Sequence, residues 1–142
     1  MNPKMSKSNR RAAVIINYLC ILLFLIFFSI IKYHGWSVPV IVGIVVSIAV
    51  VLISFFVLHI RTHLWKLVHS KIDHLDERQI QVTYESLRRS YSIFTIISLI
   101  ILLFIALLDG EHSSMLILIF ASLIYLAHTL PSSIIAWTEK EV

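Results

Sequence analysis

The sequence predicts an all-α, polytopic membrane protein with four transmembrane helices. Apolar residues make up 58% of the 142 residues and charged residues 14%, well below the roughly 25% typical of soluble domains. The apolar residues gather in four runs, each close to the length of about 20 residues that a helix needs to cross a bilayer. These runs are 12–31, 40–58, 91–108 and 115–136. Little chain remains for a soluble domain, so we expect residues 1–142 to form a single membrane domain.

The first apolar run follows a basic segment, an arrangement that secretory signal peptides share. It is longer than the apolar region of a signal peptide, and no small-x-small cleavage pattern follows it, so we expect an uncleaved first transmembrane helix. In the turn that follows, Gly35 can adopt positive φ, Ser37 is a candidate cap, and Pro39 suits the first turn of the second helix.

A long polar interval separates the second and third runs, and it predicts a cytoplasmic helical hairpin over 61–90. No Gly or Pro occurs between Ile44 and Asp109, so we expect the second helix to continue out of the membrane to Ile72. A second extension, 77–90, should lead into the third run. Each extension carries a narrow apolar stripe, and antiparallel folding would pair the two stripes. The expected pairs are Ile72 with Ile80, Val68 with Tyr84, and Trp65 with Leu87.

The second arm of this hairpin has a recognisable start. Asp76 followed three residues later by Gln79 forms a capping box, and Leu75 opposite Ile80 supplies a hydrophobic staple. We therefore interpret the segment DERQ as a structural cap and expect a new helix at this point. In the fourth run, Pro131 should kink the last third of the helix, because it lacks a backbone donor.

The placement of basic residues predicts the orientation. If both termini lie in the cytoplasm, eleven of the twelve Lys and Arg residues lie on that side and only Lys32 lies on the other. The basic residues sit beside apolar runs, so orientation in the membrane explains them better than nucleic-acid binding does, and no nucleic-acid partner is expected.

Three histidines form a candidate metal or haem site. His59 and His63 have the i, i+4 spacing with which two imidazoles on one helical face can bind a single metal ion, and His128 could approach from the fourth helix. His59 and His128 are also candidate axial ligands of a haem between helices. The alternative interpretation is that these histidines are polar anchors at the membrane surface, and we expect no cofactor.

The four apolar runs contain no Asp, Glu, Lys or Arg, the residues on which ion-coupled transport normally depends. Polar residues in the runs, among them Asn17, Ser54 and Tyr125, are adequate for interhelical hydrogen bonds of about 0.6 kcal/mol each. No triad, phosphate-binding loop or pair of membrane carboxylates indicates an enzyme.

Two segments of the sequence resemble segments of a known group of proteins. The sequence LDERQ at 75–79, with SLRRSY shortly after it, and LPSSIIAWTE at 130–139 resemble segments of small bacterial four-helix inner-membrane proteins that have a D-E-R-[QE] segment and end in L-P-x4-A-W. The resemblance covers about a fifth of the chain. It implies a bacterial inner-membrane location and assigns no functional residue.

These observations lead to the hypothesis of a non-enzymatic accessory, regulatory or immunity-type membrane protein that associates with a partner protein or with itself. The expected contact surface is a mixed basic and apolar face of the hairpin. It comprises Leu64, Lys66, Leu67, Lys71, Arg78 and Val82. The alternatives are a small oligomeric transporter or channel subunit and a haem- or metal-binding membrane protein.

Overall fold

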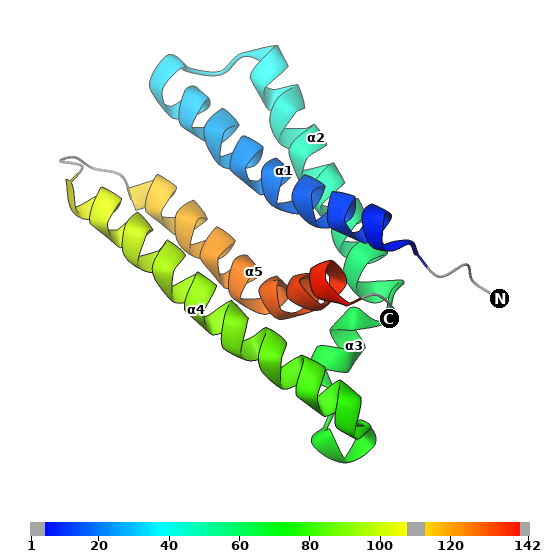
Figure 1. Ribbon diagram of the computed structural model, residues 1–142. Coiled ribbons are helices and arrows are strands. Elements are labelled where there is room, and N and C mark those ends of the chain that lie inside the picture. The colour runs from blue at the N-terminus through cyan, green and yellow to red at the C-terminus, as the bar shows by residue number, and fades with distance from the viewer. Residues whose placement is uncertain (1–4, 108–112, 140–142) are drawn as a thin grey trace.

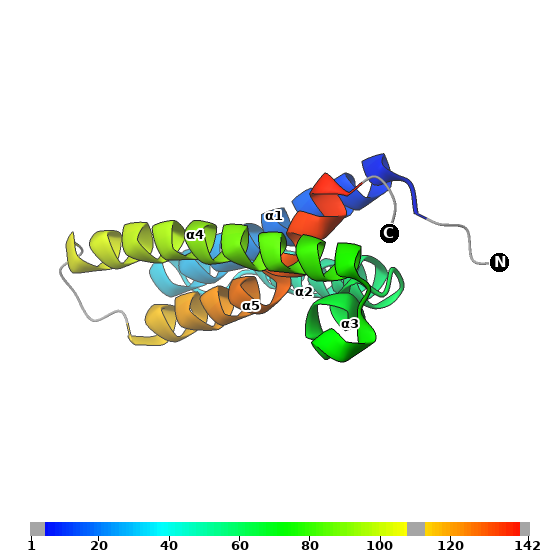
Figure 2. The same ribbon diagram turned by 60° about the horizontal axis from the view of Figure 1, so that its bottom comes forward.

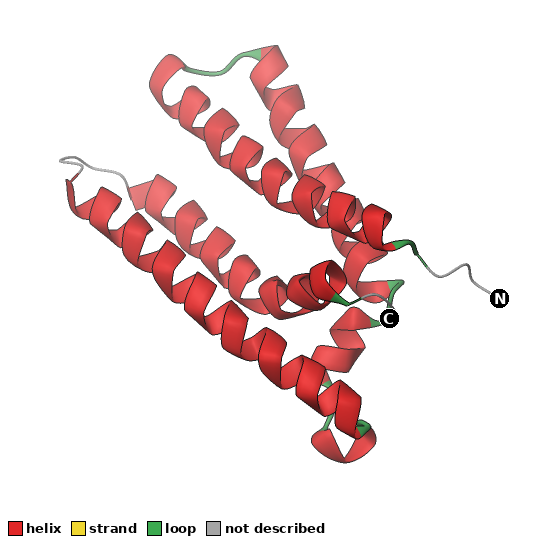
Figure 3. Cartoon of the chain, in the orientation of Figure 1, coloured by secondary structure: helices red, strands yellow, loops and turns green. Residues whose placement is uncertain are grey.

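A computed structural model describes residues 5–107 and 113–139, and within these ranges the chain is helical and contains no strand (Figures 1 and 3). Four long helices account for most of it, and each is long and apolar enough to cross a membrane, which confirms the predicted class. They are α1 (Lys7–His34), α2 (Val38–Phe55), α4 (Glu77–Leu107) and α5 (Ser113–Thr138).

The long helices form two antiparallel pairs, α1 with α2 and α4 with α5. The pairs meet where α1 crosses α5, at the end of the molecule where α1 begins and α5 ends. Away from this junction the pairs diverge, as Figure 1 shows. α5 therefore occupies the central position, in contact with both α1 and α4.

The turn between α1 and α2 follows the expectation from its sequence. Gly35 has a φ of 85°, and its N–H donates to the carbonyl of Ile31, which closes α1. Ser37 occupies the N-cap position of α2 without a side-chain hydrogen bond, and Pro39 lies in the first turn. Farther along α2, a Cβ on Gly43 would lie 2.7 Å from the ring of Phe27, so this glycine permits close packing of α2 on α1.

The segment after α2 is not the continuous helix that the absence of Gly and Pro predicted. The last turn changes to a π-helix (Phe56–Ile60), and His63 then adopts left-handed backbone angles with a φ of 61°. Two short pieces follow, α3 (Leu64–His69) and a 3-10 turn (Ile72–His74). The predicted first arm, a straight extension of α2, is therefore wrong, because the helix breaks at 61–63 and α3 packs against α5.

The predicted second arm begins as expected. Asp76 Oδ1 accepts from the backbone N–H of Gln79 at 2.7 Å, and the N–H of Asp76 donates to Gln79 Oε1 at 3.2 Å. This reciprocal pair is the predicted capping box, and α4 starts at the next residue, Glu77.

The hairpin prediction placed several side chains on the wrong face. Ile72 and Tyr84 were expected to be in the seam, yet they are 68% and 70% exposed, whereas Leu64 was expected to be on the contact surface and is fully buried. α4 instead turns its small residues Ser86 and Ser90 inward. Small side chains allow close approach of helices in a membrane protein, so α4 packs through this face.

The buried core lies at the junction of the two pairs. Its apolar residues come from α1, the π-helix, α3 and the end of α5: Ala13, Val14, Leu58, Leu64, Ile135 and Ala136. Elsewhere the long helices expose large apolar side chains, as expected for surfaces that face lipid. α5 continues through Pro131 and visibly bends near it (Figures 1 and 2), where the carbonyl of Ala127 loses its helical donor.

Candidate functional site

The most distinctive site in the described structure is a buried row of polar side chains at the α1–α2–α5 junction. Asn17 of α1 is 1% exposed, and its Nδ2 lies 2.8 Å from Ser54 Oγ of α2 and 2.9 Å from the hydroxyl of Tyr125 of α5. The Tyr125 hydroxyl donates in turn to Asn17 Oδ1 at 3.1 Å. These three residues thus form the interhelical hydrogen bonds expected from the polar residues of the spans.

Tyr18, the next residue of α1, continues the row toward the end of α5. Its hydroxyl donates to Ser133 Oγ at 3.0 Å and lies 3.2 Å from Thr129 Oγ1. Both partners belong to α5, so Asn17 and Tyr18 together fix the register of α1 on α5.

His59 ends the row inside the π-helix. Its ring is fully buried, and its Nδ1 lies 2.8 Å from Ser132 Oγ. Ser132 Oγ also donates to the carbonyl of Thr129 at 2.9 Å, so an arrangement that satisfies all three atoms has the proton of His59 on Nδ1. The other ring nitrogen, Nε2, is buried without a protein partner. Phe55 and Trp65 pack against the ring, at centroid distances of 5.0 and 6.4 Å.

The three histidines predicted as a metal or haem site do not come together. Left-handed backbone angles at His63 end the helix, so His59 and His63 do not share a helical face, and His63 is exposed. His128 is also exposed, with its Nδ1 3.0 Å from the carbonyl of Ile124 in its own helix. Among the described residues, no group of three or more His, Cys, Asp or Glu side chains could hold a metal ion. His59, His63 and His128 therefore do not form a three-ligand metal group in the described structure.

Basic residues of α1 bind the carboxyl end of α5. Lys7 Nζ donates to the carbonyl of Thr138 at 2.7 Å, Arg10 to that of Glu139 at 2.7 Å, and Arg11 to that of Trp137 at 3.2 Å. The last carbonyls of a helix lack intrahelical donors and carry partial negative charge, so cations are favourable here. The sequence indicated only the effect of these residues on orientation and gave no sign of this contact.

The contact surface predicted from the sequence is accessible only in part. Lys66, Lys71 and Arg78 are exposed, and Arg78 lies 3.5 Å from Glu139. Leu67 and Val82, however, are partly buried and pack against the core. Exposed apolar residues in this part of the molecule include Tyr84, Leu87 and Tyr91 of α4.

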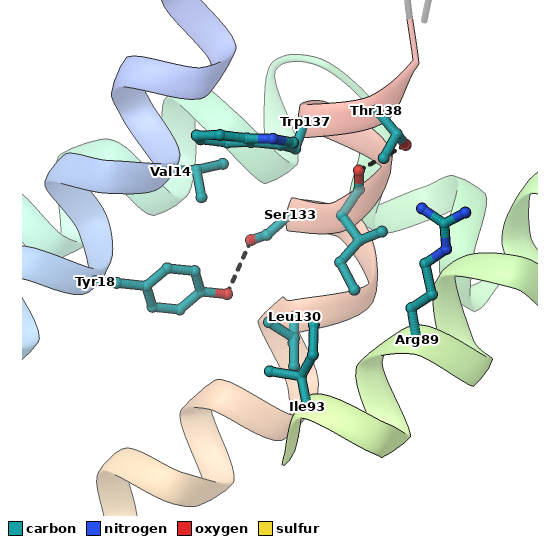
Figure 4. Close-up of a pocket in the computed structure, with 9 residues that line it drawn as sticks. Val14, Tyr18, Arg89, Ile93, Leu130, Ser133, Trp137 and Thr138 are labelled. Carbon is teal, nitrogen blue, oxygen red and sulfur yellow. Dashed lines mark hydrogen bonds between the residues drawn. The ribbon is translucent and has the colours of Figure 1, made fainter. Parts of the chain in front are cut away.

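A groove lies on the other side of α4, over the last turns of α5 (Figure 4). It has a volume of about 290 Å³. α5 forms its floor with Leu130 and Ser133, α1 contributes Tyr18, and α4 contributes Arg89 and Ile93.

No protein-family model, curated protein or solved structure matches this chain. The candidate sites therefore depend on the geometry and chemistry described above.

Proposed function

We propose that this chain is a multi-pass protein of the bacterial inner membrane, with both termini in the cytoplasm, that acts without catalysis by binding a partner protein. The distribution of basic residues supports the orientation, and the resemblance noted above supports the bacterial setting. The polar interval 61–90 would lie on the same cytoplasmic side as the two termini, so we expect the partner to bind there.

The observation that carries this proposal is an uncovered apolar stripe on α4. Tyr84, Leu87 and Tyr91 recur at intervals of three and four residues and are 70%, 45% and 74% exposed. Residues spaced in this way share one face of a helix. The face that packs inward is a different one, marked by the buried Thr83, Ser86 and Ser90. Contiguous exposed apolar surface that includes tyrosine is typical of protein interfaces.

The surroundings of the stripe favour a protein over lipid headgroups. Ile72, 68% exposed, adds an apolar residue near the cytoplasmic end, and the exposed Lys71 lies beside it in the chain. Acidic residues are interspersed over the same interval and would weaken attraction to anionic headgroups. They are Asp73, Asp76, Glu77 and Glu85.

The alternative, a small oligomeric transporter or channel subunit, draws support from the buried polar row. Asn17 and His59 lie within helices long enough to cross the membrane, and buried polar groups at such depth are often functional. Reconstitution into liposomes with flux measurements separates this class from the first. Flux that disappears in an Asn17→Leu variant would favour transport.

Site-specific photo-cross-linking tests the partner proposal. A photoreactive residue at Tyr84 or Leu87 should capture one defined protein in stoichiometric amount, or a second copy of the chain. The matched control is Ile96, which is 59% exposed on the same helix but lies deeper in the apolar run, and it should capture lipid.

Charge substitutions provide a second part of this test. Leu87→Glu, and charge reversal of Lys66 and Lys71, should each abolish the cross-link from Tyr84 without reducing the amount of protein in the membrane. Lipid adducts alone at both Tyr84 and Leu87, or a protein adduct unaffected by Leu87→Glu, would contradict the proposal.

A further inference from the structure

The groove over α5 exists because α1 and α4 both pack on α5 while lying on opposite sides of it. α1 supplies Val14 and Tyr18 to one wall, α4 supplies Arg89 and Ile93 to the other, and Leu130 lies on the floor between them (Figure 4). All three helices are long and apolar enough to cross the membrane, so we expect the open side of the groove to face the bilayer.

The chemistry of the groove changes along its length. Ile93 and Leu130 make one part of the groove apolar. Arg89 lies one helical turn before Ile93 in α4, and its guanidinium projects toward Thr138. A smaller hollow of about 90 Å³ continues from there, sharing Arg89 and Thr138 and lined also by Glu85, Ser86 and Glu139. An apolar trough therefore leads into a polar, charged end.

Further basic residues lie at the charged end. The guanidinium of Arg11 stacks over the ring of Trp137, 5.0 Å from its centroid, and Lys7 lies beside Thr138. Tryptophan at the end of a transmembrane helix is typical of the headgroup level of a bilayer. Basic pockets between transmembrane helices on the cytoplasmic side are suited to anionic headgroups.

We propose that this groove binds one anionic phospholipid, with an acyl chain along Ile93 and Leu130 and the phosphate at Arg89. The apolar length of the groove favours an amphiphile of the bilayer. At the charged end, Arg89 binds the negatively charged headgroup in competition with Glu85 and Glu139, and Lys7 and Arg11 lie near it. The groove's volume lies near the lower limit of about 300–1,000 Å³ for small-molecule sites, which fits part of a single acyl chain and excludes a bulky ligand.

Glu85 modulates this site. It pairs with Arg89 one helical turn away, and both side chains are more than half exposed. Exposed pairs of this kind contribute little stability, so the phosphate can compete for the guanidinium. Loss of the Glu85 carboxylate should therefore strengthen lipid binding, whereas loss of the Arg89 guanidinium should weaken it.

Fluorescence of Trp137 gives a direct measurement, because its ring lines the groove. In the full chain with Trp36→Phe and Trp65→Phe, Trp137 is the remaining indole, and lipids with brominated acyl chains quench it on contact. We expect brominated phosphatidylglycerol to bind about fivefold more strongly than brominated phosphatidylcholine, the ratio that one basic residue near an anionic surface provides.

Variants identify the source of this preference. Arg89→Gln should reduce the ratio to near one, Glu85→Gln should raise it, and Arg88→Gln should leave it unchanged, because Arg88 is exposed and lies outside the groove. Ile93→Phe should reduce quenching by both lipids by filling the trough, whereas Ile96→Phe should not. This pair remains informative if Arg89→Gln fails to fold.

Three outcomes would overturn the proposal. The first is equal quenching by the two lipids in the parent chain. The second is a preference that falls equally in Arg88→Gln and Arg89→Gln, which would indicate general surface charge. The third is a preference abolished by millimolar inorganic phosphate, which would show that the site binds a free anion and has no need of an acyl chain.

Discussion

At the scale of single residues, the chain places its buried polar groups where helices meet and provides partners for most of them. Asn17, Tyr18 and His59 are each bonded to a hydroxyl group on another segment. Within a bilayer a polar group has no water to replace a lost partner, so such bonds specify which faces meet. Of these three residues, His59 depends most on a single partner. Its Nε2 is buried without a protein partner, and its Nδ1 is bonded to Ser132.

Ser132→Ala should therefore destabilise the protein by about 1–3 kcal/mol, because it leaves His59 Nδ1 buried without a partner. Ser92→Ala is the matched control. Ser92 is exposed, its hydroxyl bonds only the carbonyl of Arg88 in its own helix, and the change should cost less than about 0.5 kcal/mol. Thermal unfolding in detergent, followed by circular dichroism, measures both. Equal melting temperatures for the two variants would show that the Ser132–His59 contact contributes nothing.

The sequence predicted local polar contacts and the residue types available for bonds between helices, but it could not predict which distant residues pair. Asp76 and Gln79 lie three residues apart, and their types define the capping box that the structure contains. His59 and Ser132 are 73 residues apart, and nothing in either residue type identifies the other as its partner. The same applies to Arg10, whose contact with the carbonyl of Glu139 depends on how α1 crosses α5.

At the scale of elements, the segment 56–76 differs most from the prediction. Absence of Gly and Pro indicated an unbroken helix, but the chain turns at His63 with left-handed angles that a non-glycine residue seldom adopts. Tertiary packing accounts for the difference. Breaking the helix packs α3 against α5 and buries Leu64, which a straight extension into water would leave exposed.

The element-scale prediction concerns the backbone of His63. Its side chain is exposed, so His63→Gly should stabilise the protein or leave it unchanged by relieving the positive φ, while His63→Val should destabilise it by about 1–2 kcal/mol. Urea or thermal unfolding of the two variants in detergent measures the difference. The outcome against the prediction is equal stability of both variants, which would mean that residue 63 occupies an ordinary helical conformation and that α2 continues as the sequence indicated.

At the scale of the whole molecule, four apolar runs and an all-helical fold could be predicted from hydropathy alone, and the arrangement of the helices could not. The hydrogen bonds between α1 and the end of α5 lie within residues 7–18 of α1 and residues 125–139, which include Glu139 just after α5. This is the end where both pairs of helices meet. Apolar side chains on the diverging parts carry no information about which helix they face, because lipid and a neighbouring helix are equally apolar partners.

This junction also leads to a prediction about topology. Lys7 bonds the carbonyl of Thr138, and Arg78 lies 3.5 Å from Glu139, so the starts of α1 and α4 and the end of α5 lie together. Segments held together in this way must face the same compartment, and from the distribution of eleven basic residues against one we expect that compartment to be the cytoplasm. Reporter fusions after Ser70 and Val142 should therefore both give cytoplasmic signals, while a fusion after Gly110 should give a periplasmic signal. Immunoblotting for equal amounts of each fusion is the control. A periplasmic signal at Val142 would contradict the orientation, and opposite signals at Ser70 and Val142 would contradict the junction itself.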